Sequence, residues 1–119
     1  MSWFLVKMVY RIICGEGHHK AQFDEQLRLV QAASHQQAVE KAHGIGMNEQ
    51  MNFMNEKQQL VQWKFIDISE AYQLHEIVDG TEIYSRIEER DDALVYEDIV
   101  RAKARHLLKE AKAPHLQEA

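Results

Sequence analysis

Residues 3–14 read WFLVKMVYRIIC and decide the fold, because every second residue in this stretch is apolar. The even-numbered row is Phe4, Val6, Met8, Tyr10, Ile12 and Cys14. A period of two with β-branched and aromatic residues is typical of a half-buried strand rather than a helix. The odd-numbered row is mixed and consists of Trp3, Leu5, Lys7, Val9, Arg11 and Ile13. We therefore expect a central strand that buries its even row and uses both of its faces.

A polar loop, GEGHHK at residues 15–20, follows this strand, and alternation resumes at Phe23. The pattern predicts a hairpin. We expect the register that gathers the apolar residues of both strands on one side, with Cys14 opposite Ala21. The other predicted pairs are Ile12–Phe23, Tyr10–Glu25, Met8–Leu27, Val6–Leu29, Arg11–Asp24 and Lys7–Arg28. A slip of one residue would scatter both the apolar and the polar sets.

A helix is predicted to begin at Ser34, because Ser34 followed by Gln37 forms a capping box. Helical spacing then continues to about residue 56 through Ala38, Ala42, Ile45, Met47, Met51 and Met54. Gly44 and Gly46 each cost about 1 kcal/mol relative to alanine inside a helix, so we expect a kink or break there. The methionines are interpreted as core residues, with an adaptable binding groove as the alternative.

Two further patterns complete the predicted fold. Residues 60–68 alternate as a strand, and residues 72–77 and 81–87 flank Asp79-Gly80, which is a strong hairpin signal. A second helix is predicted from Asp91 to Ala113-Pro114, with a frayed tail at residues 113–119. The predicted fold class is α+β, a single domain over residues 1–112 in the order ββαβββα, with helices packed on a mostly antiparallel sheet.

Composition narrows the function classes. A chain of 119 residues has the length of one domain with one core, and its net charge of −5 disfavours nucleic acid and anionic membranes as partners. No apolar run approaches the length of a membrane helix, because Lys7 and Arg11 interrupt the only candidate. The single cysteine, Cys14, excludes an intrachain disulfide and is interpreted as a small hydrophobe in a reducing, cytoplasmic environment.

Several aromatic and turn positions form a recognisable set. They are Trp3, Val6, Lys7, Tyr10, residues 23–25 (FDE), the Ser34 helix, Gln62, Trp63, Phe65, Asp79-Gly80 and residues 83–86 (IYSR). Over about residues 1–89 the chain resembles a small bacterial family catalogued only as a domain of unknown function. The resemblance implies no activity, and His18-His19 and the C-terminal helix lie outside it.

Candidate chemistry is sparse. Cys14, His18 and His19 are residue types that bind zinc, but a closed zinc site needs four ligands and no second pair such as CxxC is present, so no metal or cofactor is expected. Glu25, predicted opposite Tyr10, is a candidate general base, although a structural role is favoured. Phosphate-binding, dinucleotide-binding and nucleophile motifs are absent from the sequence, so no catalytic residue is assigned.

The predicted register places cations and apolar side chains together on the second face of the sheet. The candidate contact residues are Trp3, Leu5, Lys7, Val9, Arg11, Arg28 and Lys64. Lys7 opposite Arg28 is unfavourable, so we expect a neutralising partner. The candidates are the acidic start of the C-terminal helix, a second protein surface, or an anionic ligand, and the net acidity with the apolar half of the face favours the first two.

The sequence therefore predicts a non-catalytic association module, either a homodimer or a domain that binds another protein. One alternative is a binding domain for an anionic small molecule or single-stranded nucleic acid on the same face. Another is an enzyme that uses Tyr10 and Glu25 in a pocket between helix and sheet.

Overall fold

The computed structural model describes residues 1–111. Its elements are β1 (Ser2–Cys14), β2 (Gln22–Ala32), α1 (His35–Asn48), β3 (Met51–Met54), β4 (Leu60–Leu74) and α2 (Ala93–Ala111). Contacts divide the chain into two compact units, unit 1 (Met1–Ser85) and unit 2 (Arg86–Ala119), and α2 belongs to the second. The α+β class is confirmed. The single-domain extent over residues 1–112 stays a prediction, and the helix end at Ala113-Pro114 and the tail lie outside the described residues.

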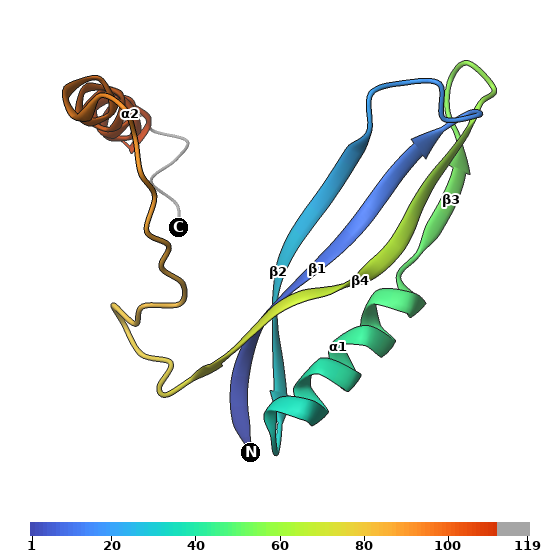
Figure 1. The fold of residues 1–119 in the computed structure, drawn as a ribbon, viewed down its shortest axis with the longest axis horizontal. Helices are drawn as coiled ribbons and strands as arrows, with labels where there is room; N and C mark the ends of the chain where they lie inside the picture. Colours follow the sequence, from blue (N-terminus) through green and yellow to red (C-terminus); the bar gives the residue numbers. More distant parts are fainter. Residues whose placement is uncertain (112–119) are drawn as a thin grey trace. The chain divides into compact units, whose positions relative to one another are not determined.

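Unit 1 is one twisted antiparallel sheet in the strand order β2-β1-β4-β3, with α1 lying along one side of it (Figure 1). We call the side that carries Phe4, Val6, Met8 and Tyr10 the helix face, and the opposite side the open face. Those four residues are buried in the core, so the predicted burial of the even row of β1 is confirmed where α1 covers it. The remainder of the core is Val30, Ala32, Ala38, Ala42 and Phe65.

The register of β1 with β2 differs from the predicted one by a single residue, so every predicted pair in this hairpin is wrong. Val6 pairs with Arg28, Met8 with Gln26, Tyr10 with Asp24, Lys7 with Leu27, and Arg11 with Phe23. The reason lies under α1, where β2 contributes the small side chains of Val30 and Ala32 to the core beside two alanines of the helix. This parity puts the larger apolar residues of β2 on the open face.

Ser34 caps α1 as predicted, because its Oγ accepts a hydrogen bond from the Gln37 backbone N–H at 3.2 Å. The helix continues without a break through Gly44 and Gly46 and ends at Asn48, before the predicted end. A Cβ on Gly46 would lie 2.3 Å from the Phe65 ring, so the close approach of α1 to β4 requires glycine there. The chain after the helix forms β3. Met51 and Met54 of β3 are exposed, so the prediction that they are core residues is wrong.

Unit 1 contains four strands where five were predicted. The predicted strands 60–68 and 72–77 are parts of one continuous strand, β4, residues 81–87 form no strand, and β3 was predicted as helix. Two register shifts of β4 against β1 leave Ile66 and Ser69 without partners. A turn forms at residues 78–81, where the Thr81 N–H donates to the Val78 carbonyl at 3.0 Å, but its flanks are not strands. The order is therefore ββαββα. Over residues 1–111, both helices lack the length and apolar character that crossing a membrane requires.

Candidate interaction surface

The open face brings together most of the contact residues predicted from the sequence. Its side chains are Trp3, Leu5, Lys7, Val9 and Arg11 from β1, Phe23, Glu25, Leu27 and Leu29 from β2, and Lys64, Asp67, Glu70 and Tyr72 from β4. Arg28 is the exception among the predicted residues, since it lies on the helix face. The sequence also missed the contribution of β2, because alternation shows which side chains share a face but not which face is covered.

Within unit 1, the β2 side of the open face is largely apolar and no other element covers it. Phe23, Leu27 and Leu29 are 55%, 50% and 47% exposed, and they share one edge of the sheet, where Glu25 lies between Phe23 and Leu27. Towards β4, Leu5 of β1 and Leu74 of β4 are buried, whereas Tyr72 is 44% exposed and bonded to Glu70. Among the paired residues of the open face, the exposed aliphatic side chains are therefore those of β2.

A polar cluster lies at the centre of the open face. The Lys7 Nζ is 2.7 Å from Glu70 Oε2, and the Tyr72 hydroxyl donates to Glu70 Oε1 at 2.5 Å. The Tyr84 ring packs edge-on against Tyr72, with centroids 5.8 Å apart, and lies 5.7 Å from the Lys7 Nζ. Lys7 is thus neutralised by Glu70 and does not face Arg28.

The electrostatics of this cluster disfavour acid–base catalysis. The hydrogen bond between Lys7 and Glu70 raises the pKa of Lys7 and lowers the pKa of Glu70. The bond from Tyr72 to the Glu70 carboxylate raises the pKa of Tyr72. General acids and bases work best with pKa values near the operating pH, and all three shifts lead away from neutrality. Lys7 and Glu70 therefore stay charged, and the cluster is an ion pair rather than a proton donor or acceptor.

A like-charge pair exists on the open face, but between residues other than those predicted. Arg11 and Lys64 are directly opposite each other across β1 and β4. Within residues 1–111 neither side chain forms an ion pair. Like charges at opposed positions destabilise a strand pair. Phe23 faces Arg11 from the other side, so this row combines two cations with an exposed aromatic ring.

The predicted catalytic pair is separated by the sheet. Tyr10 is buried on the helix face, where its hydroxyl donates to the Gly46 carbonyl at 3.0 Å, and burial raises the pKa of Tyr10. Glu25 is exposed on the open face opposite Val9. The expectation that Tyr10 and Glu25 form one acid–base site is therefore wrong.

Arg28 has an internal partner on the helix face. Its guanidinium donates to both carboxylate oxygens of Glu49, at 3.1 and 2.7 Å. This fork raises the pKa of Arg28 and lowers the pKa of Glu49. Bidentate pairs of this kind fix orientation as well as charge. Arg28 is therefore satisfied within the monomer.

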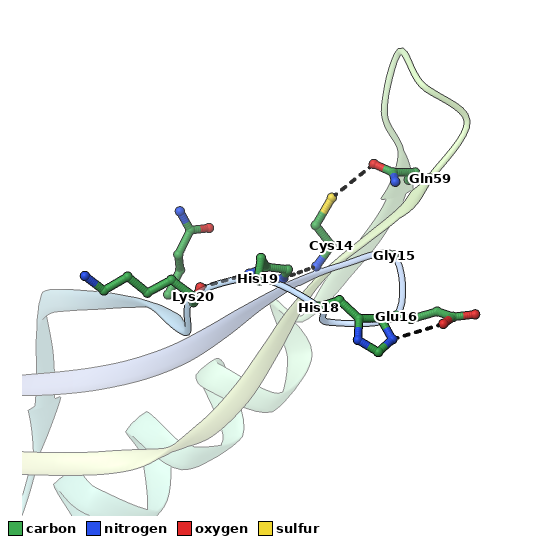
Figure 2. Close-up of a pocket in the computed structure, with 8 residues that line it drawn as sticks. Cys14, Gly15, Glu16, His18, His19, Lys20 and Gln59 are labelled. Atoms are coloured by element: carbon green, nitrogen blue, oxygen red, sulfur yellow. Dashed lines mark hydrogen bonds and ion pairs between the residues drawn. The ribbon is translucent and has the colours of Figure 1, made fainter.

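The end of β1 and the loop that follows it place Cys14, His18 and His19 around an open depression (Figure 2). His19 Nε2 accepts a hydrogen bond from the Cys14 N–H at 3.0 Å, and its Nδ1 lies 2.9 Å from the Lys20 carbonyl, so both ring nitrogens are engaged. His18 pairs with Glu16 instead. Across the described chain, no group of three or more His, Cys, Asp or Glu side chains is placed to hold a metal ion.

The fold and this surface define a class: a small α+β domain in which, within unit 1, a helix covers one face of an antiparallel sheet and leaves the other face partly exposed. The family described as "Domain of unknown function (DUF4288)" matches residues 3–85, and the chain belongs to this family. The matched range lies within unit 1, and the resemblance inferred from the sequence is confirmed. Comparisons with curated proteins and with solved structures find no match.

Proposed function

We propose that this protein is a non-catalytic association module that binds a second copy of itself through the β2 side of the open face. The observation that carries the proposal is the row of Phe23, Leu27 and Leu29, each about half exposed on an uncovered sheet surface. Single exposed apolar residues are ordinary, but a contiguous apolar patch marks an interaction site. Twofold self-pairing is the commonest way in which soluble chains associate.

The remaining open-face residues support association rather than turnover. The Lys7–Glu70 pair neutralises the centre of the face, which lowers the cost of covering it with another surface. The pKa shifts of that pair and of Tyr72 do not prepare a group for proton transfer. We also infer a cytoplasmic location from the single cysteine, and a bacterial origin from the family resemblance.

The test is the molar mass in solution, measured by size-exclusion chromatography with light scattering from low to high micromolar concentration. The unmodified chain should be a dimer, and Leu29→Glu should shift it to monomer because a carboxylate replaces an apolar contact. Met47→Glu is the matched control, since Met47 lies on α1 and is also 47% exposed. A monomeric unmodified chain at high micromolar concentration would contradict the proposal.

A second candidate function rests on Arg11 and Lys64. Two opposed cations beside Phe23 provide the charge and the aromatic surface that hold an anionic group, either a small-molecule anion or the backbone of a single strand. Retention on single-stranded DNA or heparin at low salt, lost when both cations are replaced by methionine, would favour it. The net charge of −5 works against this reading.

A further inference from the structure

The feature that carries a more specific inference is the outer edge of β2. β2 is an edge strand of 11 residues, it contains no proline, and its register with β1 runs without a shift. On the opposite side, the 4-residue β3 pairs only with residues 60–63 of β4, and the side chains of Gln50 and His35 bond the β4 backbone at Phe65 and Ala71. A long, regular edge presents unpaired backbone N–H and C=O groups, which are a template for another strand.

Two contacts show which β2 residues direct their backbone groups outward. On β1 the Cys14 N–H donates to His19 on the β2 side, so even-numbered residues of β1 direct their backbone groups towards β2. Their partners on β2 are also even-numbered. Consistent with this alternation, the Gln31 carbonyl accepts a hydrogen bond from Lys41 Nζ of α1 at 2.9 Å. The odd-numbered residues of β2 therefore direct their backbone N–H and C=O groups away from β1, towards the free edge.

Lys41 also limits the length of the free edge. It occupies the outward carbonyl of Gln31 at one end of β2. The outward residues that remain are Phe23, Glu25, Leu27 and Leu29. A partner strand that uses this edge has these four residues available for backbone pairing.

We propose that β2 pairs antiparallel with β2 of a second copy, with Gln26 opposite Gln26 on the twofold axis. The inference rests on the proposed function and specifies how its dimer forms. In this register Phe23 pairs with Leu29 of the second copy, and Glu25 pairs with Leu27 of the second copy. All four outward residues then form ladder hydrogen bonds, and Gln31 stays outside the ladder.

Side chains on both faces complement each other in this register. On the open face, Phe23 meets an apolar Leu29, which is the kind of cross-strand pair that stabilises a sheet. On the helix face, Asp24 lies opposite Arg28 of the second copy, so unlike charges oppose each other. Each already has a partner within its own copy, Glu49 for Arg28 and Trp63 for Asp24. The symmetric pairing gives one continuous antiparallel sheet, whose joined open faces bring the exposed rows of two copies together.

Neighbouring registers are less favourable. Moving the axis one residue towards Arg28 places Leu27 opposite itself and draws Gln31, whose carbonyl is already occupied, into the ladder. Moving it one residue the other way places Glu25 opposite Glu25, which opposes like charges. The register centred on Gln26 is the one that uses every free backbone group and opposes no like charges.

The first experiment blocks the edge with proline. Glu25→Pro removes an N–H that points away from β1, so it leaves the hairpin ladder intact and removes a bond needed for pairing. Gln31→Pro is the matched control, because it removes an outward N–H beyond the proposed ladder. Light scattering at high micromolar concentration should find the Glu25→Pro variant monomeric and the Gln31→Pro variant dimeric.

The second experiment traps the register with a disulfide and stays informative if a proline variant fails to fold. In a Cys14→Ser background, Gln26→Cys places two thiols opposite each other at a non-hydrogen-bonded position. There, Cα atoms lie about 4.5 Å apart, within the range a disulfide spans. Oxidation should convert this variant to a covalent dimer. Gln22→Cys, which would face Val30 of the second copy, should stay uncrosslinked.

The outcomes separate the edge register from the proposed function. A dimer that Leu29→Glu dissociates, but that survives Glu25→Pro and gives no crosslink through Gln26→Cys, would overturn edge pairing and leave association through the open face standing. An unmodified chain that is monomeric at high micromolar concentration would overturn both. Loss of the dimer in Glu25→Pro, together with the Gln26→Cys crosslink, would support the register.

Discussion

The two faces of the sheet are built from the same strands, but they are covered differently. On the helix face α1 lies over β1, and Phe4, Met8 and Tyr10 are almost completely buried. On the open face, Trp3 of β1 and Leu27 of β2 remain partly exposed. The alternation of a strand therefore sorts its side chains into two sets, and the element packed on the sheet decides which set becomes core.

The largest expected effect tests this difference with one substitution on each face. Phe4→Ala on the helix face should lower the free energy of unfolding by about 3–5 kcal/mol, because it leaves a cavity in the core. Phe23→Ala on the open face should cost about 1 kcal/mol or less in the monomer. Urea denaturation at a concentration where the chain is monomeric measures both. Equal losses would show that the open face is also packed.

The next effect concerns how closely α1 approaches the helix face. Gly46→Ala places a methyl group against the Phe65 ring and should cost roughly 1–3 kcal/mol through overpacking. Gly44→Ala has open space around its new methyl group and should stabilise the same helix by about 0.5–1 kcal/mol. Thermal unfolding of the two variants should therefore shift in opposite directions. A stabilised Gly46→Ala variant would contradict the observed packing.

Acid should lower the free energy of unfolding by protonating Glu70 on the open face. Hydrogen bonds from Lys7 and Tyr72 lower the pKa of Glu70 in the folded chain, so its stabilising contribution is complete above the unfolded value of about 4.3. That contribution is lost as the pH falls through the folded pKa. Unfolding free energies measured between about pH 3 and pH 7 should fall less steeply in Glu70→Gln. Glu82→Gln is the control, because Glu82 forms no ion pair within residues 1–111. This variant should keep the pH dependence of the unmodified chain.

The smallest effect concerns the opposed cations on the open face. Lys64→Glu places a carboxylate opposite Arg11 and should raise the free energy of unfolding by about 0.2–1 kcal/mol. Lys64→Gln removes only the repulsion and should give a smaller gain. If both variants lose stability, an anionic partner already bound at Arg11 and Lys64 would explain the loss, and the second candidate function would gain support.

The sequence was most informative where one local pattern was unambiguous. The alternation of β1 and the helix cap at Ser34 depend only on neighbouring residues, and the structure confirms both. The parity of β2 was mispredicted because its apolar residues are not its core residues. Asp24, Gln26 and Arg28 lie on the helix face and find polar partners there, and no spacing rule indicates that a face tolerates them.

Patterns that fit two structures account for the other differences. Met51 continues the spacing of the preceding helix, but Met51 and Phe53 also fit the alternation of a strand. The close contact of Gly46 with Phe65 lies near the end of α1. The turn at Gly80 forms, with a positive φ of 86°. Its flanks do not pair as strands, because a turn sequence fixes only the local backbone direction. The open-face site was therefore predictable in part from β1 alone, and its β2 half required the three-dimensional register.

The hydrogen bond from Lys41 to the Gln31 carbonyl has a consequence for how assembly ends. Edge strands of this length risk recruiting neighbours without limit, as growing fibrils do. Here the Lys41 ammonium group of α1 occupies the outward carbonyl of Gln31 at one end of the strand. In the proposed symmetric pair the outward backbone groups of the four remaining residues are all used, so β2 would offer no free ladder to a third copy.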